Sequence, residues 1–241
     1  MKPEVVKRAP GIRGRLVGSD RSVAERMRRR RWLIIGQHLP GLADMKVLDL
    51  GGTALWWRRA PVKPAHITLI NLHEPSENEP GLVAIHGDAL RAADLLPNEV
   101  FDIVFSNSLI EHLGGHGARR RFADVVTSMA PRYVIQTPYR YFPIEPHWIF
   151  PGFQFLPVSA RAYLSRKWPL GHTHGWTRLA ATNEVMSTEL LSLCEMRTYF
   201  PDAEIVWERI LGVPKSMLAI NAGPTTTVKP PRGESTELAG K

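Results

Sequence analysis

The hydrophobic positions of this chain follow two alternating patterns. Short apolar runs predict buried strands, and hydrophobic residues at helical spacing predict helices between several of them. The predicted strands are residues 46–50, 66–71, 82–86, 101–106 and 132–137. A first helix is predicted to begin near Ser19-Asp20 and to end before Pro40-Gly41. This alternation predicts an α/β fold, a Rossmann-like doubly wound sheet that is mostly parallel.

The pattern changes after Pro138. Residues from about 139 to 176 are rich in aromatic residues, proline and histidine, which indicates an insertion after the fifth strand. We therefore expect a domain over residues 19–222, preceded by a flexible basic arm at 1–18 and followed by a disordered tail at 223–241.

The last part of the predicted domain contains one helix and two strands. The helix is predicted over residues 183–200, with Ser187-Thr188 as a cap. Strands at 204–210 and 215–220 are predicted to finish the sheet as a hairpin around residues 212–214, so that the last strand is antiparallel.

Composition limits the classes of function. The 241 residues, 44% of them hydrophobic, suffice for one sizeable core. The net charge is +8, but much of the excess lies in the first 31 residues without interleaved aromatic residues, so no nucleic acid partner is expected. These basic residues form a solvated face, or contact an acidic substrate or a membrane surface peripherally.

No apolar run of membrane-spanning length and no secretory signal is found, so we expect a cytoplasmic protein. The single cysteine, Cys194, follows an apolar stretch and is predicted to be a buried thiol.

The segment Val47-Leu-Asp-Leu-Gly-Gly-Thr53 is the strongest local motif. It is a strand that runs into a glycine turn, where the backbone can approach a nucleotide at the carboxyl end of the first strand. The alternative is that the glycines only turn the chain. A nicotinamide site is disfavoured, because Thr53 and Trp56 occupy the second and third glycine positions of that fingerprint.

Two further motifs follow in order, G-D-A at 87–89 and F-D-I-V-F-S-N-S-L-I-E-H-L at 101–113. With V-L-D-L-G-G at 47–52, they resemble class I S-adenosylmethionine-dependent methyltransferases of the small-molecule, type 11-like group. The resemblance covers about residues 45–137. The segment 136–147 is similar, more weakly, to bacterial members thought to act on glycans or secondary metabolites.

The resemblance implies that the cofactor is S-adenosyl-L-methionine and indicates its contacts. The glycine-turn residues near its methionine and ribose portion would be Asp49, Gly51, Gly52 and Thr53. Asp88 would accept a hydrogen bond from the adenine amino group, with Ala89 beside the ring, while Asn107 and Ser108 would lie at the sulfonium end.

One position departs from the family. The second strand of such enzymes usually ends in an acidic residue that binds the ribose hydroxyls, and here it ends in Asn71. An amide can bind a hydroxyl without charge, and Glu74 or Glu77 is the alternative.

Methyl transfer from a sulfonium needs alignment of donor and acceptor, and a base only if the acceptor must lose a proton. The candidate catalytic residues are His112 and His147, with His147 favoured as a base for a hydroxyl. His172 and His174 are further candidates; no third ligand accompanies them, so no metal site is expected.

The acceptor pocket is expected among the aromatic residues of the insertion, with core packing as the equal alternative. These residues are Tyr139, Tyr141, Phe142, Trp148, Phe150, Phe153 and Phe155. They could stack on a sugar ring or a lipid-like chain, and Arg140 could hold an anionic group.

The function expected from the sequence is methylation of a small-molecule acceptor, with oxygen of a glycan, glycoside or secondary metabolite as first choice. One alternative is a regulatory or scaffolding protein that binds S-adenosylmethionine or S-adenosylhomocysteine without turnover. Another is an RNA or protein methyltransferase, although Ser106-Asn-Ser-Leu109 stands where base-amino methyltransferases carry an N-P-P-Y-type tetrapeptide.

Overall fold

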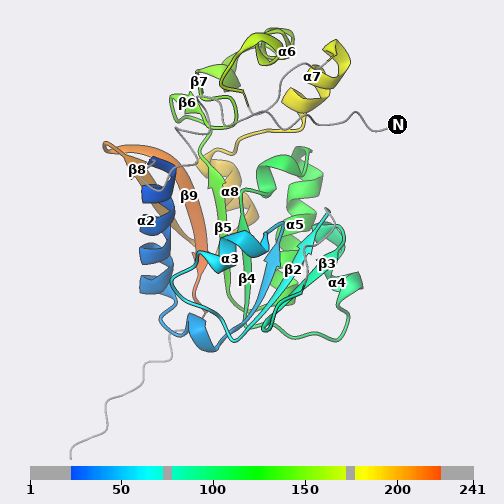
Figure 1. The fold of residues 1–241 in the computed structure, drawn as a ribbon, viewed down its shortest axis with the longest axis vertical. Helices are drawn as coiled ribbons and strands as arrows, with labels where there is room; N and C mark the ends of the chain where they lie inside the picture. The colour runs from blue at the N-terminus through cyan, green and yellow to red at the C-terminus, as the bar shows by residue number, and fades with distance from the viewer. Residues whose placement is uncertain (1–22, 73–77, 172–176, 224–241) are drawn as a thin grey trace, which may run out of the picture.

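One seven-stranded sheet organises the protein (Figure 1), whose computed structural model describes residues 23–72, 78–171 and 177–223. The strand order is β3-β2-β1-β4-β5-β9-β8. The strands are β1 Lys46–Leu50, β2 His66–Asn71, β3 Leu82–His86, β4 Ile103–Asn107, β5 Tyr133–Pro138, β8 Glu204–Ile210 and β9 Val213–Asn221. Strands β1 to β5 are parallel, and β9, the last strand in the sequence, runs antiparallel to β5 and β8. The predicted Rossmann-like sheet with an antiparallel last strand is therefore confirmed.

Helices cover both faces of this sheet. The α-helices are α2 Val23–His38, α3 Ala54–Arg58, α4 Ala92–Leu95, α5 Gly115–Met129, α6 Val158–Lys167, α7 Arg178–Met186 and α8 Leu193–Tyr199. Short 3₁₀ turns are η1 Leu42–Asp44, η2 Ala89–Arg91, η3 Ile110–His112 and η4 Phe153–Phe155. Helices α2 and α3 pack on one face, and α4, α5 and α8 pack on the other.

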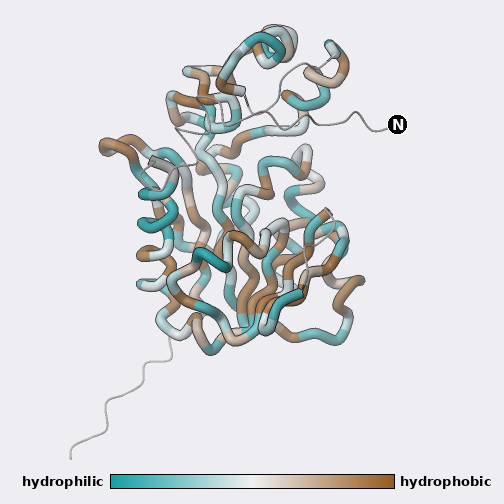
Figure 2. The backbone as a smooth tube through the Cα atoms, in the orientation of Figure 1, coloured by the Kyte–Doolittle hydropathy of each residue, from teal (hydrophilic) through white to brown (hydrophobic). Residues whose placement is uncertain are grey.

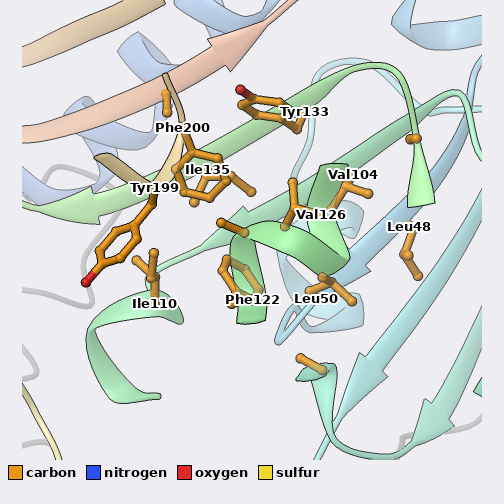
Figure 3. Packing of buried hydrophobic residues seen from close by; sticks show 14 of the residues in the cluster. Leu48, Leu50, Val104, Ile110, Phe122, Val126, Tyr133, Ile135, Tyr199 and Phe200 are labelled. Atoms are coloured by element: carbon orange, nitrogen blue, oxygen red, sulfur yellow. The ribbon is translucent and has the colours of Figure 1, made fainter. Parts of the chain in front are cut away.

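The alternation of side chains along β1 explains the two layers. Val47 points to the α2/α3 layer, whereas Leu48 and Leu50 point to the layer of α5. Phe122 and Val126, one turn apart on α5, are fully buried in that second layer with Leu50 (Figure 3). Hydrophobic residues accordingly follow the central strands (Figure 2). Each fully buried side chain of this size stabilises the fold by about 1.5–3 kcal/mol.

The insertion after β5 forms a separate layer above the carboxyl ends of the strands (Figure 1). We call residues 139–171, together with α7, the lid. It contains a two-stranded ribbon, β6 Ile144–Glu145 and β7 Phe150–Pro151, and the packed pair of helices α6 and α7. Its core is a cluster of buried residues, Trp148, Phe153, Ala162, Ala181 and Val185.

The single helix predicted over 183–200 is wrong. Helix α7 ends at Met186 and α8 begins at Leu193, and the intervening segment passes Leu191 beside Tyr139 in an isolated bridge. Ser192 starts α8 through a reciprocal capping box with Glu195. The chain therefore leaves the lid and re-enters the domain between these two helices.

Two smaller expectations also change. The hairpin turn lies at Leu211-Gly212, both with positive φ, so Val213 and Pro214 already belong to β9. Cys194 is exposed, because α8 presents it on its outer side, and the predicted buried thiol is wrong.

Within the described parts of the chain, no helix has both the length and the apolar character required to cross a membrane. The predicted arm at 1–18, the tail beyond Gly223, Glu74, Glu77, His172 and His174 lie outside the described residues.

Candidate functional site

The turn after β1 requires glycine at both of its first positions. Gly51 has φ +79°, and a Cβ there would lie 2.9 Å from a methyl carbon of Leu109. A Cβ on Gly52 would overlap with the carboxylate of Asp49. The backbone of this turn is thus close to its neighbours at the carboxyl end of β1, and the amide of Gly51 donates to the carbonyl oxygen of Ile70 at 2.8 Å.

Asp49 lies buried beneath the turn. Its Oδ2 accepts a hydrogen bond of 2.7 Å from the indole Nε1 of Trp57, while Oδ1 has no hydrogen-bond partner. Burial raises the pKa of the Asp49 carboxyl to about 7, and the bond from Trp57 opposes that rise. Asp49 therefore supports the turn from below.

Asn71, at the end of β2, contacts the same turn. Its amide nitrogen donates to the carbonyl oxygen of Gly52 at 2.9 Å. Asn71 thus positions the glycine turn, and its expected contact with a ribose remains a prediction.

Asp88 follows β3 as the cap of η2. Its Oδ1 accepts from the amide of Leu90 at 2.9 Å, and Ala89 is buried behind it. The carboxylate is partly exposed, so it can accept a further hydrogen bond at this edge of the sheet.

Asn107 ends β4, and Ser108 follows it. Ser108 has φ +56°, and its hydroxyl donates to Oε1 of Gln136 at 2.9 Å. The Asn107 side-chain oxygen accepts from the guanidinium of Arg31, which also forms a two-point ion pair with Glu208 at 2.9 and 2.6 Å. A buried charge network thus anchors Asn107.

Strand register brings most of the predicted cofactor residues to one edge. Gly51 follows Leu50, which pairs with Ile70 beside Asn71, and Asn71 pairs with His86 beside Asp88. Asn107 ends the neighbouring strand β4. Parallel strands place these carboxyl ends together, as Rossmann-like ligand sites require.

Thr53 points elsewhere. Of the predicted cofactor residues, it alone lines a cavity of about 1040 Å³ between α2 and α3, whose walls include Trp32, Trp56 and Arg28. Thr53 therefore lies apart from the cluster of residues at the strand ends.

The two candidate catalytic histidines lie next to each other. The rings of His112, in η3, and His147, in the lid, are 5.0 Å apart and nearly perpendicular. His147 Nδ1 lies 2.7 Å from Oε1 of the buried Glu145, and His112 Nδ1 lies 3.3 Å from the hydroxyl of Thr188. A carboxylate that orients an imidazole is typical of histidines that accept protons or bind metals.

Two pairs among the aromatic residues of the lid differ in their burial. Trp148 and Phe153 stack in the buried lid core, so they pack and do not line a pocket. Tyr141 and Phe155 are exposed and stack at 6.1 Å. Arg140 bonds to the carbonyl of Leu190 and to Glu195, which fixes its side chain.

Sequence reasoning missed three functional neighbours, Arg31, Glu145 and Glu208. Arg31 stands in the basic run assigned to a solvated face, yet it is buried. The sequence offered no clear signal for Glu208, because the same strand also carries Glu204 and Arg209 and the pattern does not tell which charge is buried.

No protein-family model and no curated protein matches the chain. Similar solved structures include the N-methyltransferase NodS from Bradyrhizobium japonicum with bound S-adenosylhomocysteine, at 13% identity, TM-score 0.48, and 86% and 94% of the two chains covered. Another is the magnesium protoporphyrin IX methyltransferase ChlM from Synechocystis, at 10% identity, TM-score 0.48, and 87% and 93% covered. A third is a Burkholderia thailandensis 1,6-didemethyltoxoflavin-N1-methyltransferase, at 12% identity, TM-score 0.49, and 82% and 79% covered. The similarity is remote, so the roles of residues are derived from this chain's own geometry.

Proposed function

We propose that this protein is an S-adenosylmethionine-dependent methyltransferase that acts on a small-molecule acceptor. The observation that carries the proposal is the polar edge formed by the ends of β1 to β4. The glycine turn, Asp88 and Asn107 all lie at this edge, where a ligand that contains a nucleoside could contact each of them.

The residues present fit this cofactor. The close-packed turn at Gly51 and Gly52 leaves backbone, without side chains, facing the ligand position. Asp88 would accept from the adenine amino group, and Asn107 would lie near the reacting end, held by Arg31. Bound there, S-adenosylmethionine would supply a methyl group on a positively charged sulfur.

The acceptor would lie between this edge and the lid. His112 and His147 are the catalytic candidates, because they join the end of β4 to the lid and Glu145 fixes the ring of His147. Histidines suit the activation of a hydroxyl, so the proposed acceptor atom is oxygen. The exposed pair Tyr141 and Phe155 offers a stacking surface for a sugar-containing or other hydroxylated acceptor.

Calorimetric titration with S-adenosylmethionine and S-adenosylhomocysteine tests the cofactor site. We expect micromolar binding by the wild type and a loss of roughly 10–100-fold in Asp88→Asn, because a hydrogen bond to a charged group contributes about 1.5–3 kcal/mol. The matched control is Asp94→Asn, an exposed aspartate on α4 that should leave binding unchanged. If folded wild-type protein binds neither ligand, the proposal is wrong.

A turnover assay distinguishes an enzyme from a protein that only binds the cofactor. Incubation with labelled S-adenosylmethionine and a panel of hydroxylated glycosides and metabolites should give a labelled acceptor and S-adenosylhomocysteine. Cofactor binding without transfer to any acceptor in the panel, nor to RNA or protein, would favour the regulatory alternative.

A further inference from the structure

Three side chains with metal-binding atoms converge where the lid meets the end of β4. Glu111 and His112 belong to η3, and His147 lies between β6 and β7 of the lid. Each offers one ligand atom, and these atoms all lie within 4.8 Å of one another. The convergence depends on the fold, because His147 is remote in sequence from the other two.

Each of the three side chains is oriented by a second partner. Glu145 Oε1 lies 2.7 Å from His147 Nδ1, and Thr188 Oγ1 lies 3.3 Å from His112 Nδ1. The hydroxyl of Thr137 donates to Glu111 Oε2 at 2.9 Å. Histidines that bind metals usually contact a carboxylate or another polar group through the second ring nitrogen. The Nε2 atoms are therefore the nitrogens suited to coordination.

The Glu111 carboxylate provides a separate observation. The residue is 0% exposed, and its Oε1 has no hydrogen-bond partner. An unpartnered buried carboxylate oxygen is costly, and a cation beside it would offset that cost.

We propose that Glu111, His112 and His147 bind a divalent transition-metal ion of the class of Zn²⁺. One carboxylate and two imidazoles form a ligand set that this class accepts, and three protein ligands leave a coordination position for an exogenous oxygen. The sequence expectation of no metal considered only His172 and His174, and the proposed site departs from it.

The role of the ion deepens the proposed methyltransferase function and rests on it. The ion would connect the lid to the end of β4 through its protein ligands. It would bind an acceptor hydroxyl at its open coordination position. Coordination lowers the pKa of a bound hydroxyl, whose proton passes to solvent water. His147 then acts as a ligand, and Glu145 is a positioning residue for its ring.

Zn²⁺ binding to the full chain, stripped with a chelator, tests the site without any acceptor. Calorimetry should give one equivalent per chain. His112→Gln, at an exposed position, should weaken affinity at least tenfold, and so should Glu111→Gln. Glu145→Gln should weaken it roughly 10–100-fold, as for other second partners of metal-bound histidines. His66→Gln, at the opposite end of the sheet, is the matched control and should bind as the wild type does.

The proposal fails if folded wild-type protein binds no stoichiometric Zn²⁺, or if His112→Gln and Glu145→Gln bind it unchanged. Glu111 and Glu145 are both buried, so a variant at either position is read only where it folds, and His112→Gln, at its exposed position, decides the outcome. A parallel titration with S-adenosylhomocysteine separates the two proposals: cofactor binding without Zn²⁺ binding overturns the metal site alone, and Zn²⁺ binding without cofactor binding overturns the methyltransferase.

Discussion

Gly52 sits directly on the buried carboxylate of Asp49, so close that no side chain fits between them. We predict that Gly52→Ala destabilises the fold and abolishes binding of S-adenosylhomocysteine, because the new methyl group must displace either the turn or the carboxylate. Strain of this kind in a packed site typically costs about 1–3 kcal/mol. Urea unfolding and calorimetry would measure the two effects.

Gly36→Ala provides the control for that variant. Gly36 lies inside α2, and a Cβ there would meet nothing within 4 Å. Alanine in a helix interior is more stable than glycine by about 0.5–1 kcal/mol, so this variant should be slightly more stable and should bind normally. Equal behaviour of the two variants would contradict the close approach at Gly52.

The buried carboxyl of Asp49 should make stability depend on pH. Its pKa is raised from 3.8 to about 7, so the unfolded chain ionises before the folded one does. The contribution of Asp49 to stability is therefore most favourable at low pH and falls as pH rises from about 4 to about 7, after which it is constant. The total is a few kcal/mol, at about 1.4 kcal/mol per pKa unit.

Asp49→Asn isolates this effect, since the amide oxygen can still accept from Trp57 but cannot ionise. The difference between the two unfolding free energies, variant minus wild type, should increase between pH 4 and pH 7. Urea titrations at several pH values would measure it. Parallel curves for the two proteins would show that Asp49 does not titrate in this range.

Local patterns sufficed to predict the strands of the sheet. The apolar runs at 46–50, 66–71 and 82–86 coincide with β1, β2 and β3. Strands β1 and β2 are buried inside the sheet and are therefore mostly hydrophobic on both faces, whereas β3 is an edge strand that is only partly buried. The break between α7 and α8 was missed because leucines at 190, 191 and 193 continue the apolar pattern through it. Long-range contacts hold this segment out of the helical arrangement, among them the bridge of Leu191 with Tyr139 and the bond from the Glu189 amide to the carbonyl of Glu111.

The residues of the candidate site likewise fall into those that local sequence patterns predict and those that they do not. Residues at strand ends, such as Asp88 and Asn107, were predictable, because motif spacing places them at the carboxyl edge. The pairing of Arg31 with Glu208 joins residues 177 positions apart and depends on how α2 packs against β8. No pattern along the chain contains that information.

That ion pair carries a prediction of its own. Glu208→Gln should destabilise the protein by about 3–5 kcal/mol, because it leaves the buried Arg31 guanidinium without a counter-charge. Affinity for S-adenosylhomocysteine should also fall, since Arg31 holds Asn107. Asp94→Asn, which breaks the exposed pair with Arg91, should cost less than about 1 kcal/mol. Similar losses in the two variants would contradict a structural role for the buried pair.

The start of α8 offers a final test, because it is the point where the chain returns from the lid. The Ser192 hydroxyl accepts from the amide of Glu195 at 3.3 Å, and the Glu195 carboxylate accepts from the amide of Ser192 at 2.8 Å. Ser192→Ala removes the first bond and should cost about 1 kcal/mol in urea unfolding. Ser187→Ala, whose hydroxyl only bonds to a carbonyl at the end of α7, should change stability by less than about 0.5 kcal/mol. If the Ser192 variant instead matches the Ser187 variant, the capping box does not determine where α8 begins, and packing of Leu191 against Tyr139 alone separates the two helices.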